Sequence, residues 1–287
     1  MIPNIVPEKA SIEITTACNH SCSYCPVSEF PQKQRVMPLD FFDRAMSELE
    51  SLGHHLRRIS FSHYNEPLLD PLLVDRVRIA TEYSFFNVIL IHSNLSKMKE
   101  SLPEDLQFAK DMLVFSVNLP TTDRERYARI HGIDHYPKVV ANLEKLIKGG
   151  FEVKINVQSS TLTSPDDEEG VLKKFGELIP VDVIKSDSRG GLVEELTIPK
   201  NEGVLVGCSV KRPINHVHIG IDGEIYLCCQ DFSKEYRFGS LKEDHLIDIL
   251  NSESTRRTLE YIYCEREAPR NFICRSCEFA VYKGKER

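Results

Sequence analysis

The chain has 287 residues, and its 41% hydrophobic and 28% charged residues indicate a folded globular protein rather than a disordered one. The 36 lysines and arginines are outnumbered by 43 aspartates and glutamates, so the net charge of −7 disfavours nucleic acid as a partner. No stretch approaches the roughly 18–20 apolar residues of a membrane span, and the N-terminus lacks a signal-peptide pattern.

Strand-like and helix-like segments alternate over residues 11–190. We expect strands at Ser11–Thr16, Arg57–His63, Phe86–His92, Met112–Asn118, Glu152–Ser159 and Val181–Lys185. We expect helices at Pro38–Leu52, Pro71–Ser84, Leu102–Phe108, His135–Lys148 and Pro165–Leu178. This alternation predicts an α/β fold with a parallel sheet, and six strands with five helices indicate an open, partial (β/α)6 barrel. Ligands of such sheets bind at the carboxyl ends of the strands.

The pattern changes after residue 190. Residues 191–207 resemble a linker, which divides the chain into a barrel at 1–190 and a small domain at 208–287. Within the small domain, His216–Ile221 and Glu224–Cys228 are joined through Asp222-Gly223, which predicts a β-hairpin with a tight turn. A helix at Leu241–Asn251 and a cysteine-bearing tail follow.

The nine cysteines are expected to bind metal or to do chemistry. Without a signal peptide the protein is expected in the cytoplasm, where disulfides are disfavoured. The first strand runs into Cys18, Cys22 and Cys25, a C-x3-C-x2-C loop. Three thiolates at this spacing can cap one face of a [4Fe–4S] cluster and leave its fourth iron open to a small molecule. The alternative is a zinc knuckle, although zinc normally takes four ligands.

The loop of Cys18, Cys22 and Cys25 after a first strand resembles the radical S-adenosylmethionine (SAM) superfamily. The resemblance implies a [4Fe–4S] cluster whose open iron binds SAM, and an electron donor such as flavodoxin or ferredoxin. It also implies an enzyme that reductively cleaves SAM to a 5′-deoxyadenosyl radical, which abstracts hydrogen from a carbon of the substrate.

The same resemblance implies a set of SAM-binding or substrate-binding residues near the strand ends. Tyr24 occupies the position that packs near the adenine, and Glu66 the position that meets the SAM amino group. One arginine after the fourth strand often holds the SAM carboxylate in relatives, and Arg124, Arg126 and Arg129 resemble one face of a helix there. The residues implied are Tyr24, Asn65, Glu66, Asn94, Ser116 and Asn118.

A second set of cysteines lies in the small domain: Cys208, Cys228, Cys274 and Cys277. Gly223–Cys228 is a G-x4-C segment, and Cys274–Cys277 is C-x2-C. The pattern resembles the SPASM domain in its shortened twitch form, which implies one auxiliary [4Fe–4S] cluster on these four thiolates. A structural zinc ribbon closed by the same residues is the alternative.

The resemblance leaves the outcome of the reaction open between dehydrogenation and epimerisation. The chain begins almost at the first strand, without the extra N-terminal peptide-recognition domain of many relatives, so a small polar substrate such as a sugar or aminocyclitol is expected. The alternatives are a ribosomally made peptide and, outside enzymes, a redox or metal-binding module. Cys229 is a candidate hydrogen donor for epimerisation, against the alternatives of a small buried side chain or a cluster ligand. Cys264, which resembles a helix core position, is the weaker candidate.

Overall fold

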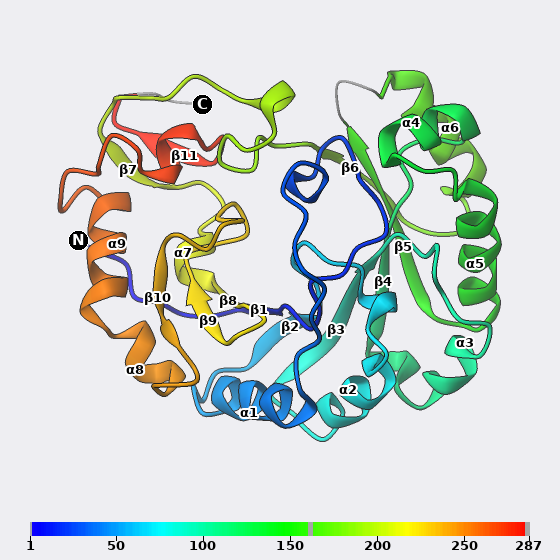
Figure 1. Ribbon diagram of the computed structural model, residues 1–287, viewed down its shortest axis with the longest axis horizontal. Coiled ribbons are helices and arrows are strands. Elements are labelled where there is room, and N and C mark those ends of the chain that lie inside the picture. Colours follow the sequence, from blue (N-terminus) through cyan, green and yellow to red (C-terminus); the bar gives the residue numbers. More distant parts are fainter. Residues whose placement is uncertain (1, 160–162, 285–287) are drawn as a thin grey trace.

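The computed structural model describes residues 2–159 and 163–284, and its main feature is a curved sheet (Figure 1). Within the described residues the sheet has nine strands in the order β10-β9-β8-β1-β2-β3-β4-β5-β6. Strands β1 to β6 are parallel, each paired with the next, which confirms the predicted α/β fold and partial barrel. Their bounds are β1 Lys9–Ile12, β2 Leu56–Ser60, β3 Phe86–Ser93, β4 Leu113–Asn118, β5 Glu152–Ser159 and β6 Val181–Lys185.

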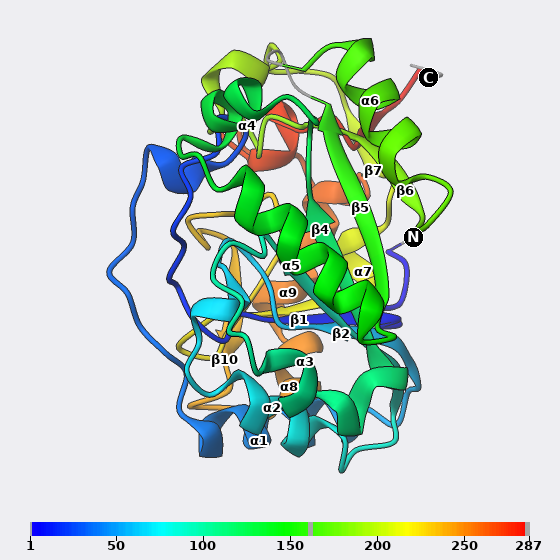
Figure 2. The ribbon, with the colours of Figure 1, turned by 90° about the vertical axis from the view of Figure 1, so that its right-hand side faces the viewer.

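Helices cover the outer face of this curve (Figures 1 and 2). They are α1 Leu39–Glu50, α2 Leu73–Ala80, α3 Leu102–Asp105, α4 Arg124–His131, α5 Tyr136–Lys148 and α6 Pro165–Phe175. Their starts follow local chemistry: Asp123 accepts from the Arg126 amide to cap α4, and Ser164 with Asp167 forms a capping box on α6. The expected helix at Leu102–Phe108 is shorter, because the chain tightens into a 3-10 segment at Gln107–Met112.

The C-terminal hairpin is part of the same sheet. Strand β8 (His216–Ile219) pairs in parallel with β1, and β9 (Glu224–Tyr226) and β10 (Arg237–Ser240) follow antiparallel. Strand β1 therefore pairs with β2 along one edge and with β8 along the other, so the backbone groups on both of its edges have hydrogen-bond partners. The remaining elements are β7 Leu205–Cys208, α7 Arg212–Asn215, α8 Leu246–Leu250, α9 Glu253–Ile262 and β11 Ala280–Tyr282, with β7 and β11 paired.

Of the helix expected at Leu241–Asn251, the structure shows only the C-terminal part as a short helix, α8. The Ser252 side chain accepts from the Thr255 amide and so caps a separate helix, α9. This second helix ends at Ile262, and Cys264 lies beyond it, exposed and with φ of +65°. The expectation that Cys264 is a helix core position is therefore wrong, because the helix stops two residues earlier.

The two faces of the barrel strands differ in polarity. Outward residues such as Ile12, Ile59 and Phe61 are fully buried against the helices, and Phe61 meets Phe42 of α1 edge-on at 5.3 Å. The residues that alternate with them face inward and are polar although buried. They include Ser11, Glu13, Ser60, Ser116, Asn156 and His218. A polar lining that is withheld from solvent marks the inside of the barrel as a binding site.

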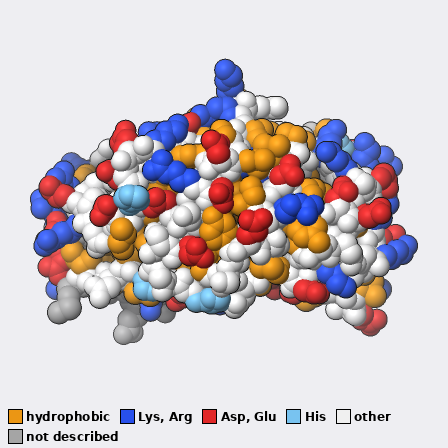
Figure 3. Space-filling model, turned by 90° about the horizontal axis from the view of Figure 1, so that it is seen from below, with side chains coloured by type: hydrophobic (Ala, Val, Ile, Leu, Met, Phe, Trp, Pro, Cys, Tyr) orange, Lys and Arg blue, Asp and Glu red, His pale blue; other side chains and the backbone are white. Residues whose placement is uncertain are grey.

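The outer surface shows no comparable concentration of one kind of side chain in the view of Figure 3, where acidic, basic and apolar groups are interspersed. None of the helices in the described ranges is both long and apolar enough to cross a lipid bilayer.

Candidate active site

The first cysteine loop follows β1 and lies inside the curve of the sheet (dark blue in Figure 1). Burial, followed by the charges of Cys25 and Cys18, raises the pKa of the Cys22 thiol well above its usual range. The three sulfur atoms therefore share one small region, in which all three cysteines are half-buried. A metal centre relieves the mutual repulsion of buried thiolates, so this donor set fits an iron–sulfur cluster.

The cysteine loop is held against the end of α4. The Ser21 amide donates to the His131 carbonyl at 3.1 Å, and the Ser23 amide to the Ile130 carbonyl at 2.9 Å. The helix end at that contact is Gly132, whose φ is +72°. A Cβ there would clash with the Ser21 hydroxyl and lie 3.0 Å from the Ser21 carbonyl oxygen, so a glycine at this left-handed position favours the close approach of the loop to the end of α4.

A chain of three histidines leads away from Cys22. The Cys22 sulfur lies 3.1 Å from His131 Nδ1, and His131 Nδ1 lies 3.3 Å from His20 Nδ1. His20 Nε2 lies 3.1 Å from His135 Nδ1. A thiolate has no proton to donate, so with Cys22 ionised the His131 N–H is the donor to its sulfur. The sequence analysis missed His131, because no regular spacing links it to a cysteine 109 residues away.

Glu66 is buried beside the cysteine loop and is engaged by the protein itself. Its carboxylate accepts from the Leu68 amide at 3.0 Å, the Ser93 hydroxyl at 2.7 Å and the Asn94 amide at 2.6 Å. Burial raises the pKa of Glu66 to about 7, against the effect of these hydrogen bonds. Burial also raises the pKa of Cys18 to about 11, and the charge of Glu66 contributes to that rise.

Two other expected SAM contacts are occupied by local hydrogen bonds. The Asn65 side chain accepts from the His63 amide at 2.7 Å and donates to the Phe61 carbonyl, which shapes the turn after β2. The Asn94 side chain donates to Asn19 and accepts from Ser96, which ties the end of β3 to the cysteine loop. Both residues therefore position the loops around the site.

The remaining expected contacts lie inside the barrel. Tyr24 is buried, and its hydroxyl lies against the Cys22 sulfur. The Ser116 hydroxyl accepts from Asn156, whose Oδ1 is buried and lacks a partner in the described ranges. Asn118, at the end of β4, is half-buried. Of the candidate arginines, Arg124 pairs with Asp134 and Arg126 with Asp167, while Arg129 is exposed.

The second set of cysteines converges in the C-terminal part. Cys208 ends β7, Cys228 follows β9, and Cys274 and Cys277 lie on and after the 3-10 segment Ile273–Ser276. Burial, followed by the charges of Cys277 and Cys208, raises the pKa of Cys274 well above its usual range. Burial and the charges of Cys229, Cys274 and Cys277 do the same for Cys228. Cys228 and Cys277 are buried, and Cys208 and Cys274 are half-buried. Four converging thiols of this kind fit an iron–sulfur cluster or a zinc ion.

Arg189 and Cys229 lie between the two cysteine sets. Burial favours the neutral form of Arg189, but the charges of four neighbouring groups outweigh it and raise the pKa of Arg189. These groups are Tyr64, Asp187, Cys229 and Cys25. Cys25 belongs to the first set, and Cys229 is the neighbour of Cys228 in the second, so Arg189 is near both. The Tyr64 hydroxyl donates to the Cys229 carbonyl and closes this region from the side of β2.

Buried polar atoms without a partner in the described residues gather near Cys229. They are His63 Nε2, both ring nitrogens of His218, the Tyr226 hydroxyl and Gln230 Oε1. The His63 ring lies 5.2 Å from Tyr226 and 6.3 Å from His218. Burial lowers the pKa of His218 to about 3 and that of His63 well below its usual range, so both imidazoles are neutral near pH 7. Such rings can accept a proton from, or donate one to, a polar ligand.

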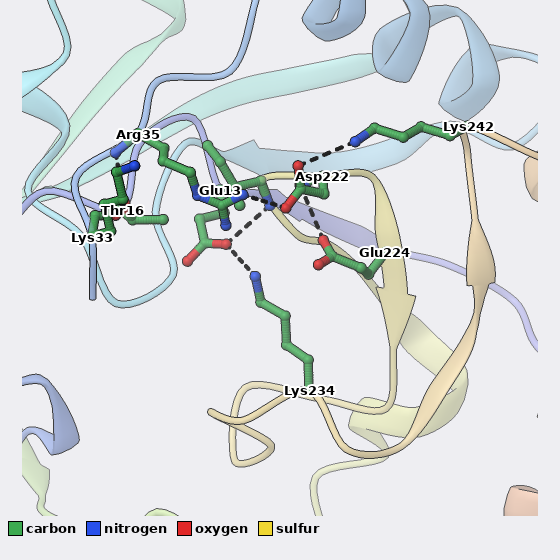
Figure 4. Close-up of polar contacts among 9 residues, drawn as sticks. Glu13, Thr16, Lys33, Arg35, Asp222, Glu224, Lys234 and Lys242 are labelled. Carbon is green, nitrogen blue, oxygen red and sulfur yellow. Dashed lines mark hydrogen bonds and ion pairs between the residues drawn. The ribbon is translucent and has the colours of Figure 1, made fainter. Parts of the chain in front are cut away.

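One charged pair lies at the wall of this region (Figure 4). The Glu13 carboxylate of the segment after β1 pairs with the buried Lys234 ammonium and accepts from the Ile221 amide at 3.0 Å. Lys234 also lies 5.7 Å from the centre of the Tyr226 ring. The pair joins the barrel to the hairpin and its following loop, and it presents no net charge to a ligand.

Family models match most of the chain. The model described as the radical SAM superfamily matches residues 12–174, and that described as an iron–sulfur cluster-binding SPASM domain matches residues 208–278. A SAM-dependent 2-deoxy-scyllo-inosamine dehydrogenase of Niallia circulans is 24% identical over 280 residues, 96% of this chain and 94% of that protein. A GTP 3′,8-cyclase of Chlorobaculum tepidum is 27% identical over 146 residues, 50% of this chain and 43% of that enzyme.

Solved structures show the same fold. The structure of BtrN in complex with AdoMet and 2-DOIA has a TM-score of 0.64 and 21% identity, covering 96% of this chain and 94% of BtrN. Streptococcus suis SuiB bound to its precursor peptide SuiA has a TM-score of 0.74 and 14% identity, covering 96% of this chain and 71% of SuiB.

Proposed function

Because the chain belongs to the radical SAM superfamily, we propose that it dehydrogenates a hydroxyl-bearing carbon of a small polar substrate such as a sugar or an aminocyclitol. Neutral, buried and unpartnered imidazoles between the two cysteine sets are the observation that carries this proposal. The similarity to an aminocyclitol dehydrogenase over nearly the full length of both chains supports it.

Cys18, Cys22 and Cys25 would hold the SAM-binding [4Fe–4S] cluster, and Cys208, Cys228, Cys274 and Cys277 an auxiliary one. When bound and reduced by a donor such as flavodoxin or ferredoxin, the first cluster with SAM supplies a 5′-deoxyadenosyl radical that takes a hydrogen atom from the substrate carbon. The His131 N–H would hold the Cys22 sulfur, from which its Nδ1 lies 3.1 Å away. The buried Glu66 carboxylate would accept the SAM ammonium.

Oxidation of an alcohol carbon to a ketone removes one hydrogen atom, one proton and one electron. The hydroxyl would donate a hydrogen bond to the neutral His63 or His218 ring, since each has a ring nitrogen without a partner in the described residues. Its proton would pass to that ring as the electron leaves, because the protonated ketone is a much stronger acid than the alcohol. The remaining electron would leave towards the second cysteine set, since Arg189 is near both sets. The Arg189 guanidinium would hold a developing oxyanion on the same side.

The position of Cys229 favours a second candidate outcome, epimerisation. Burial raises the pKa of Tyr226, and the charges of Glu13 and then Cys229 raise it further. Because a charge acts this way only at short range, Cys229 lies beside Tyr226 on the inner side of the hairpin. A thiol there could return a hydrogen atom to the opposite face of a substrate carbon. A peptide substrate, like the precursor peptide in the SuiB complex, is the remaining alternative.

The test incubates the reconstituted enzyme with SAM, dithionite and a panel of aminocyclitols and sugars in deuterated water. Dehydrogenation predicts 5′-deoxyadenosine together with a product that has lost two hydrogen atoms. Cys229→Ala should keep this activity, and His63→Gln should lose the ketone while still cleaving SAM. A product of unchanged mass that carries solvent deuterium, and that disappears in Cys229→Ala, would establish epimerisation instead.

A further inference from the structure

Three neighbouring strands place basic side chains in one row at the amino end of the barrel. Strands β8, β1 and β2 lie side by side (Figure 1), and in their register Lys9 is opposite both His216 and Arg58. The residues next to these, including Ala10, Ile59 and Val217, are buried in the apolar core towards the helices. His216, Lys9 and Arg58 therefore face the inside of the barrel together.

The charges of this basic row are not neutralised. The side chains of Lys9 and Arg58 form no hydrogen bond or ion pair with any described residue. Burial lowers the pKa of Lys9, and the charge of Arg58 lowers it further. Burial and the charges of neighbouring groups, Arg58 and Lys9 among them, lower the pKa of His216. Like charges opposite each other on adjacent strands are destabilising, so this arrangement has an energetic cost in the free protein.

Arg212 of α7 adds a further positive charge to the row. It acts on both Lys9 and His216, and its Nη1 is buried without a partner among the described residues. Although burial opposes it, the charges of Cys229, Cys228 and Asp187 raise the pKa of Arg212, so negative groups face this end of the row. Glu8, which is exposed, is the acid that acts on Lys9. Within the described residues no buried acid acts on Lys9, Arg58 or His216, although the chain as a whole carries a charge of −7.

The basic row leads towards the imidazoles of the candidate active site. His218 is 1% exposed and stacks on His216 at 4.1 Å, and both of its ring nitrogens lack partners in the described ranges. His218 is also opposite Tyr226 in the sheet. A ligand could thus contact the basic row at one end and the region beside Cys229 at the other.

We propose that His216, Lys9, Arg58 and Arg212 bind a phosphate group of the substrate. This inference rests on the proposed function and narrows its substrate to a phosphorylated sugar, cyclitol or nucleotide-linked sugar. A guanidinium fork, an ammonium and imidazole N–H groups are the donors that recognise a phosphate dianion. Several unbalanced cations suit a dianion better than a single carboxylate. The phosphate relieves the repulsion within the row and fixes the distance from the anchor to the reacting carbon.

The test measures binding of inorganic phosphate and of pyrophosphate to the reconstituted, SAM-bound enzyme by calorimetry. Wild type should bind at least one of them saturably, and Arg58→Gln should weaken that binding at least about tenfold. Arg57→Gln is the matched control, since Arg57 is the adjacent, exposed arginine of the same strand, and should bind like wild type. Tighter binding of pyrophosphate would indicate a nucleotide diphosphate sugar, and tighter binding of phosphate a sugar or cyclitol phosphate.

Thermal unfolding checks that the variants are folded. In the absence of phosphate, Arg58→Gln should unfold at a temperature no lower than that of wild type, because the substitution removes a repulsion between like charges. Added phosphate should raise the unfolding temperature of Arg58→Gln less than that of wild type. Equal phosphate affinity in wild type, Arg58→Gln and Arg57→Gln, or no saturable binding to wild type, would overturn the proposed site. Oxidation of an unphosphorylated aminocyclitol at the same kcat/KM by wild type and Arg58→Gln would overturn it while leaving the dehydrogenase function intact. Phosphate binding without oxidation of any phosphorylated substrate would overturn the dehydrogenase function alone.

Discussion

The pKa of Glu66 predicts how SAM affinity depends on pH. Burial raises the pKa of this carboxyl from 4.5 to about 7 in the free protein, despite three hydrogen bonds that favour the ionised form. The ammonium of SAM binds the carboxylate and not the carboxylic acid, so only the ionised fraction is competent. At pH 6, one unit below that pKa, about a tenth of the protein is ionised, and the apparent affinity should be about tenfold weaker than at pH 8.

The Glu66→Gln variant removes this dependence. It should bind SAM about 10–150-fold more weakly at pH 8, because a hydrogen bond to a charged group contributes ~1.5–3 kcal/mol. Its SAM affinity should then change little between pH 6 and 8. The same carboxyl makes the protein less stable as the pH rises from about 4.5 to 7, since its raised pKa favours the protonated folded form. The free energy of unfolding should fall by roughly 3 kcal/mol over this pH range, which corresponds to the rise in the pKa of Glu66 from 4.5 to about 7.

The assay is equilibrium binding of SAM to the anaerobically reconstituted protein between pH 6 and 8, with iron content measured for each sample. Glu66→Ala should also retain its iron, although it leaves two buried amides and the Ser93 hydroxyl without an acceptor and should unfold more easily. A Glu66→Gln protein with the affinity of wild type, or with the same slope against pH, would refute the placement of Glu66 beside the SAM ammonium.

Two further predictions concern the metal centres. Reconstitution should give about eight irons per chain, four for each cysteine set. Changing Cys18, Cys22 and Cys25 to Ala should remove about half of the iron and abolish SAM cleavage. Zinc in place of iron at the second set, Cys208, Cys228, Cys274 and Cys277, would contradict the auxiliary cluster. His131→Phe should make the potential of the first cluster more negative, because it removes the N–H donor to the Cys22 sulfur. For this one-electron couple a tenfold change in the reduced fraction corresponds to about 59 mV, and EPR-monitored titration measures it. His135→Ala, at the far end of the histidine chain, should shift the potential less, and equal shifts in the two variants would count against the direct hydrogen bond.

The sequence by itself determined the barrel and the two cysteine sets. Alternating strands and helices carry their periodicity locally, which is why Glu152–Ser159 and Val181–Lys185 are found with the predicted bounds. The spacing of Cys18, Cys22 and Cys25 is also local, since one short loop carries all three thiols. The ends of helices were less predictable where a side-chain cap such as Ser252 divides an apolar stretch into two elements.

Only the tertiary structure decided which distant residues meet. Residues 9, 58 and 216 form one row because β8 pairs with β1, a contact between strands about 200 residues apart that no local pattern records. His131 reaches Cys22 because Gly132 lets the end of α4 approach the cysteine loop. Long-range pairing depends on which strand edge and which helix end are left unsatisfied once the local elements have formed. The two cysteine sets could therefore be predicted from sequence as candidate ligands, while the groups expected to tune them and to anchor the substrate emerged only from the fold.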